Sequence, residues 1–193
     1  MNNEKMYPFP WWLNPQMYYM YPNPFMFDPR MYNMYMDNYL ENQQAYKLAS
    51  DTMSIKIKDY GPEPLVIDID KASEQNNNFR TVLWTGQNFQ VTLMSIPVGE
   101  DIGLEVHNID DQFIRIVDGQ GIVRMGDSKD NLNFQKRIHE DYAIMIPAGK
   151  WHNIINTGNE PLKLYSIYAP PVHPRDTVHK TKADAQSSER YYR

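Results

Sequence analysis

The chain has 193 residues, a formal net charge of −5 at pH 7 and no cysteine, which excludes disulfides and thiolate metal ligands. The acidic balance, with no basic cluster larger than residues 175–182, argues against a nucleic-acid partner. There is no run of about 18 apolar residues and no leader pattern at the start, so we expect cytoplasmic synthesis without a membrane span or a signal peptide.

The first part of the chain differs in composition from the rest. Residues 1–46 hold eight of the 12 Met, eight of the 14 Tyr and six of the 14 Pro, with two Trp and almost no Val, Ile or Ala. The prolines before residue 31 prevent helices and interior strands, so we predict an extended arm over residues 1–50. Residues 31–42 fit a short helix or a strand equally well.

Two interpretations of this arm stay open. A disordered tail is one, although disordered segments are usually poor in aromatic residues. The other is an adhesive segment, because Tyr and Trp combine a large apolar area with a polar group and Met packs adaptably. In that case residues 1–46 pack against a neighbouring subunit and produce a homo-oligomer, a dimer or a larger assembly.

From residue 56 onward, short segments alternate apolar and polar residues and are separated by Gly-, Asn- and Asp-rich turns. Such a pattern predicts an all-β domain, over residues 51–182, that closes as a barrel with two sheets. A surface loop is expected at residues 71–78 and a flexible tail at residues 183–193. The predicted strands cover residues 64–69, 79–84, 89–96, 112–117, 120–125, 142–146 and 162–168.

Two spaced motifs predict a metal pocket. They are Gly99-x5-Glu105-x-His107-x4-Gln112-x6-Gly119 and Pro147-x-Gly149-x2-His152-x3-Asn156. Glu105 and His107 are two residues apart, so their side chains leave the same face of an extended strand. Gln112 follows on the next strand, and His152 arrives from a distant segment. These nitrogen and oxygen donors suit a divalent ion such as Mn, Fe or Zn.

The spacing resembles that of the cupin superfamily, whose motifs are usually written Gly-x5-His-x-His-x(3,4)-Glu-x6-Gly and Gly-x5-Pro-x-Gly-x2-His-x3-Asn. Three identities depart from it: Glu105 replaces the first His, Gln112 replaces the Glu, and Asp141 replaces the Gly that opens the second motif. The resemblance covers residues 55–182 and implies a double-stranded β-helix, the jelly-roll barrel. It also implies pairing of subunits through their sheets, with a dimer as the minimum.

Each candidate ligand also has a structural interpretation. The ligand set resembles that of the phosphomannose isomerase type of cupin, with Gln and Glu exchanged in order, which supports metal binding more than sugar isomerisation. Gln112, a neutral amide, is the weakest member and would otherwise hydrogen-bond a metal-bound water. His139, His173 and His179 are interpreted as packed or surface histidines. Asn156 is expected to serve the turn that follows it.

Three hypotheses for function follow. The first is a structural, self-assembling protein, because Tyr-rich arms resemble those of coat proteins of endospore-forming bacteria, which implies deposition in the spore coat. The second is a metal-dependent enzyme on a small polar substrate such as a sugar, with isomerase, decarboxylase or dioxygenase chemistry. The third is a module that binds a small-molecule ligand through its metal. The residues alone do not decide whether the chain is an enzyme.

Overall fold

The computed structural model describes residues 29–52 and 54–191, and the chain divides into two units, Met1–Met53 and Ser54–Arg193. In the first unit the described part is helix α2, Pro29–Thr52. A proline suits the first position of a helix, and the Met, Leu, Glu and Gln residues that follow are good helix formers. The last part of the predicted extended arm is therefore helical, and residues 1–28 lie outside the described residues.

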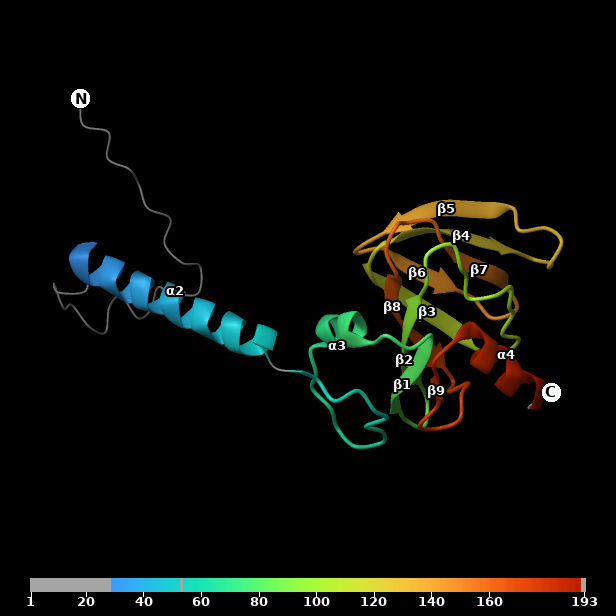
Figure 1. The fold of residues 1–193 in the computed structure, drawn as a ribbon, viewed down its shortest axis with the longest axis horizontal. Helices are drawn as coiled ribbons and strands as arrows, with labels where there is room; N and C mark the ends of the chain where they lie inside the picture. Colours follow the sequence, from blue (N-terminus) through green and yellow to red (C-terminus); the bar gives the residue numbers. More distant parts are fainter. Residues whose placement is uncertain (1–28, 53, 192–193) are drawn as a thin grey trace, which may run out of the picture. The chain divides into compact units, whose positions relative to one another are not determined.

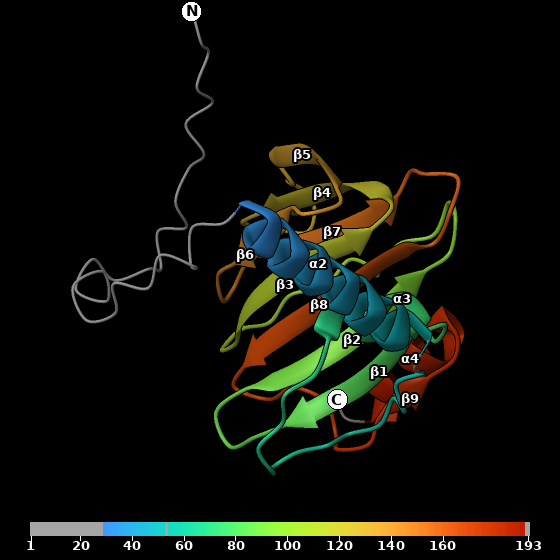
Figure 2. The same ribbon diagram turned by 90° about the vertical axis from the view of Figure 1, so that its left-hand side faces the viewer.

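The second unit is built from two antiparallel sheets that face each other (Figure 1). One has six strands in the order β6-β3-β8-β2-β1-β9, and the other has three in the order β5-β4-β7. Figure 2 shows β3, β8, β2 and β1 side by side. The strands are β1 (Arg80–Thr85), β2 (Gln90–Ile96), β3 (Asp111–Asp118), β4 (Gln120–Gly126), β5 (Phe134–His139), β6 (Ala143–Ile146), β7 (Trp151–Asn156), β8 (Leu162–Ala169) and β9 (Val178–His179).

This architecture confirms the predicted all-β jelly-roll fold. The main core lies between the sheets, where inward-facing Ile, Leu, Val and Met side chains of both sheets are buried together. A second apolar cluster covers the outer face of the six-stranded sheet, where residues of β1 and β2 pack with the segment 55–69. Among the residues that the structure describes, no helix has both the length and the apolar character needed to cross a bilayer.

Two predicted elements near the start of the domain differ in the structure. Residues 64–69 form no strand, and residues 69–75 of the expected strand and loop form helix α3, Ile69–Gln75. Asp68 starts this helix because its side chain accepts a hydrogen bond from the Lys71 N–H at 3.0 Å. Burial of Ala72 and Ser73 holds the helix to the domain, which the polar composition of the region did not indicate.

Four further elements were missed: strands β5, β7 and β9 and helix α4. Strand β5 exposes every side chain except Ile138, so it shows no apolar alternation. Helix α4, Lys182–Tyr191, occupies most of the predicted flexible tail. Thr181 and Asp184 cap it reciprocally, with Thr181 N–H donating to Asp184 Oδ2 at 2.9 Å and Asp184 N–H to Thr181 Oγ1 at 3.2 Å. Ala185, 3% exposed, anchors the helix in the main core.

The interior of the six-stranded sheet is apolar at one end and polar at the other. Leu164 of β8 lies opposite Met94 and Ile116, and all three belong to the main core. Two and four residues further along β8, Ser166 and Tyr168 face the same side. Their opposite neighbours include Thr92, Gln90 and Gln112, so this end of the barrel is lined by buried polar side chains.

The Asp59 carboxylate joins three distant stretches of the domain near this polar end. It accepts hydrogen bonds from Gly61 N–H at 2.9 Å, from Thr85 N–H at 3.0 Å and from Thr85 Oγ1 at 2.7 Å. Asp176 N–H lies 3.3 Å away and Arg175 Nε 3.9 Å away. Burial alone would raise the pKa of Asp59, but these contacts outweigh burial and hold this pKa below its usual value.

We predict that Asp59→Ala lowers the free energy of unfolding by about 2–4 kcal/mol, because buried N–H donors lose their acceptor. Since the pKa of Asp59 is lower in the folded than in the unfolded chain, the stabilisation by its charge is present above about pH 4 and is lost as the pH falls through the folded-state pKa.

Urea unfolding of both proteins from pH 7 to pH 3 measures this effect. The difference between wild type and variant should shrink in acid. Asp127→Ala is the control, since this carboxylate is 79% exposed and pairs on the surface with Lys150. Equal effects of the two substitutions at pH 7 would show that the Asp59 contacts contribute little.

Candidate metal centre

The segment between β2 and β3 supplies two of the predicted ligands. Its backbone runs antiparallel to β7 and pairs with it at isolated positions, at Asp101 with Ile155 and at Glu105 with His152. Glu105 N–H donates to the His152 carbonyl at 3.0 Å, and His152 N–H donates to the Glu105 carbonyl at 2.9 Å. Directly opposed residues project to the same side of a sheet, so these two side chains enter the barrel together.

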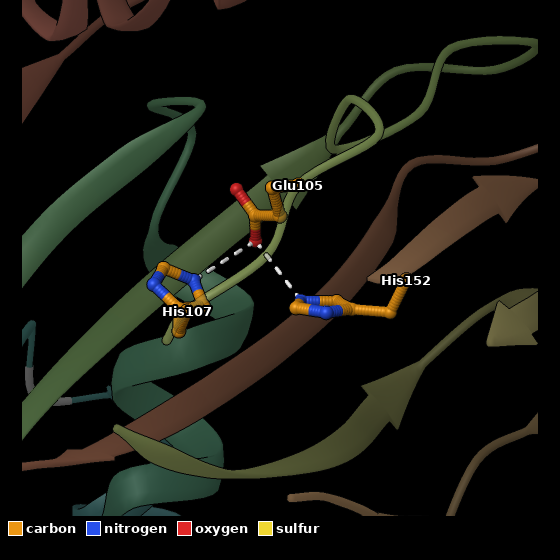
Figure 3. A group of neighbouring side chains, drawn as sticks. All are labelled: Glu105, His107 and His152. Atoms are coloured by element: carbon orange, nitrogen blue, oxygen red, sulfur yellow. Dashed lines mark ion pairs between the residues drawn. The ribbon is translucent and has the colours of Figure 1, made fainter. Parts of the chain in front are cut away.

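Figure 3 shows the Glu105 carboxylate between the rings of His107 and His152. Glu105 Oε1 lies 3.3 Å from His152 Nε2 and 3.6 Å from His107 Nε2. One ligand atom from each of the three residues lies within 4.8 Å of the other two, and the imidazole centroids are 5.7 Å apart. The convergence of Glu105, His107 and His152 that the motif spacing predicts is present in the structure.

The second imidazole nitrogen of His152 orients its ring. His152 Nδ1 lies 2.9 Å from the Lys150 carbonyl oxygen, so Nδ1 carries the proton and donates it there. His152 Nε2, the other ring nitrogen, faces Glu105 Oε1 and is the atom that would bind a metal. His107 Nδ1 lies 3.7 Å from the Asp110 carboxylate, a contact too long for a hydrogen bond.

Glu105 remains ionised in this setting. Burial by itself would raise the pKa of its carboxyl group, but the contacts with His107 and His152 and the positive charge of Arg80 outweigh burial and hold this pKa far below its usual range. The side chain keeps 18% exposure and His107 keeps 15%, whereas His152 is fully buried. The cluster therefore offers one anionic oxygen and two buried imidazole nitrogens.

Gln112 lies on the inner face of β3 and is 3% exposed. Its Nε2 donates to Ser166 Oγ at 2.9 Å, which leaves Oε1 as the atom available for another contact. Oε1 has no hydrogen-bond partner among the described residues. That Gln112 is a fourth ligand stays a prediction.

Buried polar atoms without hydrogen-bond partners show whether these residues fit a metal ion. Buried polar atoms in folded proteins almost always have partners. Within the described part of the chain, His107 Nε2, His152 Nε2 and Gln112 Oε1 have none. All three are atoms that ligate Mn, Fe or Zn, and together with the Glu105 carboxylate they fit a divalent ion.

Two turns with left-handed backbone support the centre. Gly149 has a φ of 80°, and its N–H donates to the His107 carbonyl at 2.7 Å. An added Cβ would meet no atom within 4 Å, so the left-handed backbone conformation, and not a lack of space, requires glycine here. Asp141, which replaces a motif glycine, keeps the same conformation with a φ of 70°. Its Oδ1 accepts a hydrogen bond from Arg115 at 2.7 Å.

Asn156 has the predicted role in its turn. Its Oδ1 accepts from Gly158 N–H at 2.9 Å, and its Nδ2 donates to the Ile96 and Glu160 carbonyls at 2.9 and 2.8 Å. The side chain thereby ties the end of β7 to β2, which fixes the strand that carries His152.

Sequence reasoning missed the residues beside the centre. The Tyr168 ring packs edge-on against His107, with centroids 5.4 Å apart, and His173 packs edge-on against Tyr168 at 5.2 Å. His173, interpreted from the sequence as a packed or surface residue, thus lies near the cluster. It comes from a loop after β8 and belongs to no spaced motif, so the sequence carries no pattern that would have revealed it.

Two surface hollows lie away from the cluster. One, of about 410 Å³, is lined by residues of the β3–β4 turn and of the β7–β8 turn and by His139 and Glu140. The other, of about 390 Å³, lies beside the start of α4 and is lined by Phe79, Lys180 and Lys182. Neither contains a residue of the candidate centre, so the chemistry of the donor set, and not the volume of a hollow, identifies the site.

Known proteins share this sequence and this fold. The family model described as the cupin domain matches residues 92–168. The uncharacterized protein YrkC of Bacillus subtilis (strain 168) is 65% identical over 136 residues, which span 70% of this chain and 73% of YrkC. The uncharacterized protein L612 of Acanthamoeba polyphaga mimivirus is 41% identical over 110 residues, 56% of this chain and 67% of L612.

A solved structure agrees with these relatives. The crystal structure of BH2720 from Bacillus halodurans matches with 60% sequence identity and a TM-score of 0.68, and the match covers 68% of this chain and 99% of BH2720. The close relatives, the family model and the two facing antiparallel sheets all point to one assignment. The chain belongs to the cupin superfamily.

Proposed function

We propose that the chain is a metal-dependent cupin that acts on a small polar molecule at a divalent ion held by Glu105, His107 and His152, with Gln112 as a fourth ligand. The observation that carries the proposal is the convergence of three ligand atoms within 4.8 Å of one another. Two of these atoms are imidazole nitrogens that have no hydrogen-bond partner in the described residues. Mn, Fe and Zn all suit this donor set.

The protein residues define what the site can do. A divalent ion held there would act as a Lewis acid that polarises an oxygen of the bound molecule. Glu105 neutralises part of the charge of the ion. Ser166 holds the Gln112 amide so that its oxygen stays free. Isomerisation, decarboxylation and dioxygenation are all compatible with such a centre, and the fold does not choose among them.

A protein purified without an affinity tag should carry close to one equivalent of Mn, Fe or Zn by elemental analysis. The same centre could instead bind a small ligand without catalysing a reaction. Turnover assays on metal-loaded protein distinguish an enzyme from such a ligand-binding module. A folded protein that takes up no divalent ion would overturn the proposal.

The ligand set predicts the effect of substitutions. His152→Ala should lower the affinity for Mn²⁺ or Zn²⁺ roughly tenfold or more, because it removes a first ligand. His107→Ala, at a partly exposed position, should do the same with less effect on packing. Calorimetric titration measures the affinity, and circular dichroism checks that each variant is folded.

His139→Ala is the matched control, since His139 lies on β5 outside the cluster and contacts Tyr142 and the Glu140 carbonyl. Metal affinity should not change in this variant. Equal losses in all three variants would contradict the assignment of His107 and His152, and unfolding on removal of the metal would show a structural role for the ion instead.

Assembly through the N-terminal arm is a second candidate function, favoured by the surface of α2. Met34, Tyr39 and Leu40 of this helix are 57%, 50% and 51% exposed. Apolar side chains on an exposed helix are commonly covered in an oligomer. This observation favours a homo-oligomer, and deposition in a spore coat remains a prediction from composition alone.

Deletion of residues 1–46 tests this second candidate. The shortened chain should remain a folded, soluble dimer with unchanged metal affinity, because it has lost the aromatic and Met side chains of the arm. The full chain should form larger assemblies. Light scattering coupled to size-exclusion chromatography measures the masses. Identical assemblies of both chains would mean that the arm does not drive association.

A further inference from the structure

A metal ion does not account for all the unsatisfied polar atoms in the barrel. His173 Nε2 and, apart from its contact with the Tyr168 phenol, Thr92 Oγ1 also have no hydrogen-bond partner among the described residues. Thr92 is fully buried on the inner face of β2. A buried polar atom without a partner is costly unless a ligand or a water supplies the contact. Something other than the ion therefore belongs in this part of the interior.

Tyr168 connects these two groups with the metal centre. Its ring lies against His107 on one side and against His173 on the other, at 5.4 and 5.2 Å between centroids. Thr92 lies opposite Ser166, two residues before Tyr168 on β8, and both face the interior. Thr92, Tyr168 and His173, which we call the distal subsite, thus adjoin the metal centre through the ring of His107.

The segment that carries His173 is held in place by Gln90 of β2. Gln90 Nε2 donates to the His173 carbonyl at 2.9 Å, and Gln90 Oε1 accepts from His173 N–H at 3.0 Å. Gln90 Nε2 also donates to Thr85 Oγ1 at 2.9 Å, which itself bonds to Asp59. A buried network therefore positions His173, as a preorganised binding site requires.

The groups of the distal subsite are suited to donate hydrogen bonds. The Tyr168 phenol, 1% exposed, offers a hydroxyl donor. Burial, together with the charge of Arg80, lowers the pKa of His173 to about 3, so its imidazole is neutral and carries one N–H. Arg80, 1% exposed, faces the interior from β1, in register with Met94 of the main core. Hydroxyl donors, an imidazole and a nearby guanidinium favour an anionic acceptor.

We infer that the distal subsite of Thr92, Tyr168 and His173, beside Arg80, binds the carboxylate of a small organic acid whose second oxygen function reaches the metal centre. This inference deepens the proposed function and rests on it, because the ion holds the other end of the same molecule. It narrows the substrate class from small polar molecules to small carboxylic acids with a hydroxyl or carbonyl oxygen near the carboxylate.

Lactate and lactamide distinguish a carboxylate from its neutral amide at nearly equal size. The full-length protein, loaded with Co²⁺, is titrated with each compound by calorimetry, and the visible spectrum of Co²⁺ reports whether the ligand reaches the ion. Lactate should bind about tenfold or more tightly than lactamide and should shift the Co²⁺ absorption, since a charged acceptor forms stronger hydrogen bonds.

Two nearly isosteric variants test the residues themselves. Tyr168→Phe and Thr92→Val each remove one hydroxyl, and each should weaken lactate binding about tenfold while leaving the Co²⁺ content unchanged. Tyr165→Phe is the control, because Tyr165 lies on the same strand and belongs to the outer apolar cluster. This variant should bind lactate as the wild type does.

The outcomes distinguish a failure of the distal subsite from a failure of the metal centre. Co²⁺ uptake without preference for lactate over lactamide, or equal affinities in Tyr168→Phe and Tyr165→Phe, would overturn the distal subsite and leave the metal centre standing. A wild-type protein that binds no Co²⁺ would overturn the proposed function and this inference together. Lactate selectivity that both hydroxyl deletions reduce, with metal content unchanged, would establish the subsite.

Discussion

Two backbone hydrogen bonds between Glu105 and His152 determine where the candidate metal centre lies. Glu105 belongs to a segment with little regular pairing, whereas His152 belongs to a strand in a sheet. The two hydrogen bonds fix the position of the segment relative to the strand, because directly opposed residues project to the same side at a set distance. His107 then follows two residues later, and the Gly149 N–H bonds its carbonyl. Carboxylate and imidazoles are thus positioned by backbone contacts before any ion binds.

Motif spacing predicted this convergence well because it is a property of the backbone. Period-two geometry and the two glycine-marked turns are readable in a sequence, and so is the polar identity of Glu105, His107 and His152. The surroundings of the cluster were not readable. His173 approaches it through a contact across 83 residues, with Gln90, for which no local pattern exists. The position of His173 depends on a loop that the Gln90 side chain holds, and a loop residue of this kind shows no periodicity in the sequence.

Helix α3 and strand β5 were misassigned for a different reason. Helix α3 and strand β5 are each stabilised by few buried residues, Ala72 and Ser73 in one and Ile138 in the other. Composition and alternation report burial, so elements with polar, exposed surfaces escape them. Helix α4 was missed for a different reason, because its start signal is present in the sequence. The Thr181-Lys-Ala-Asp184 capping box correctly marks the start of a helix. Reading the termini for caps as carefully as for periodicity would have found it.

The hydrogen bonds of Asp59 also bear on the order in which the domain folds. The carboxylate contacts residues 26 and 117 positions further along the chain. Contacts of such separation form late, because the entropy of closing a long loop must be overcome first. During synthesis, the segment that carries Glu105 and the strand that carries His152 leave the ribosome before residue 176 does. The metal ligands can therefore meet before the contact between Asp59 and Asp176 has formed.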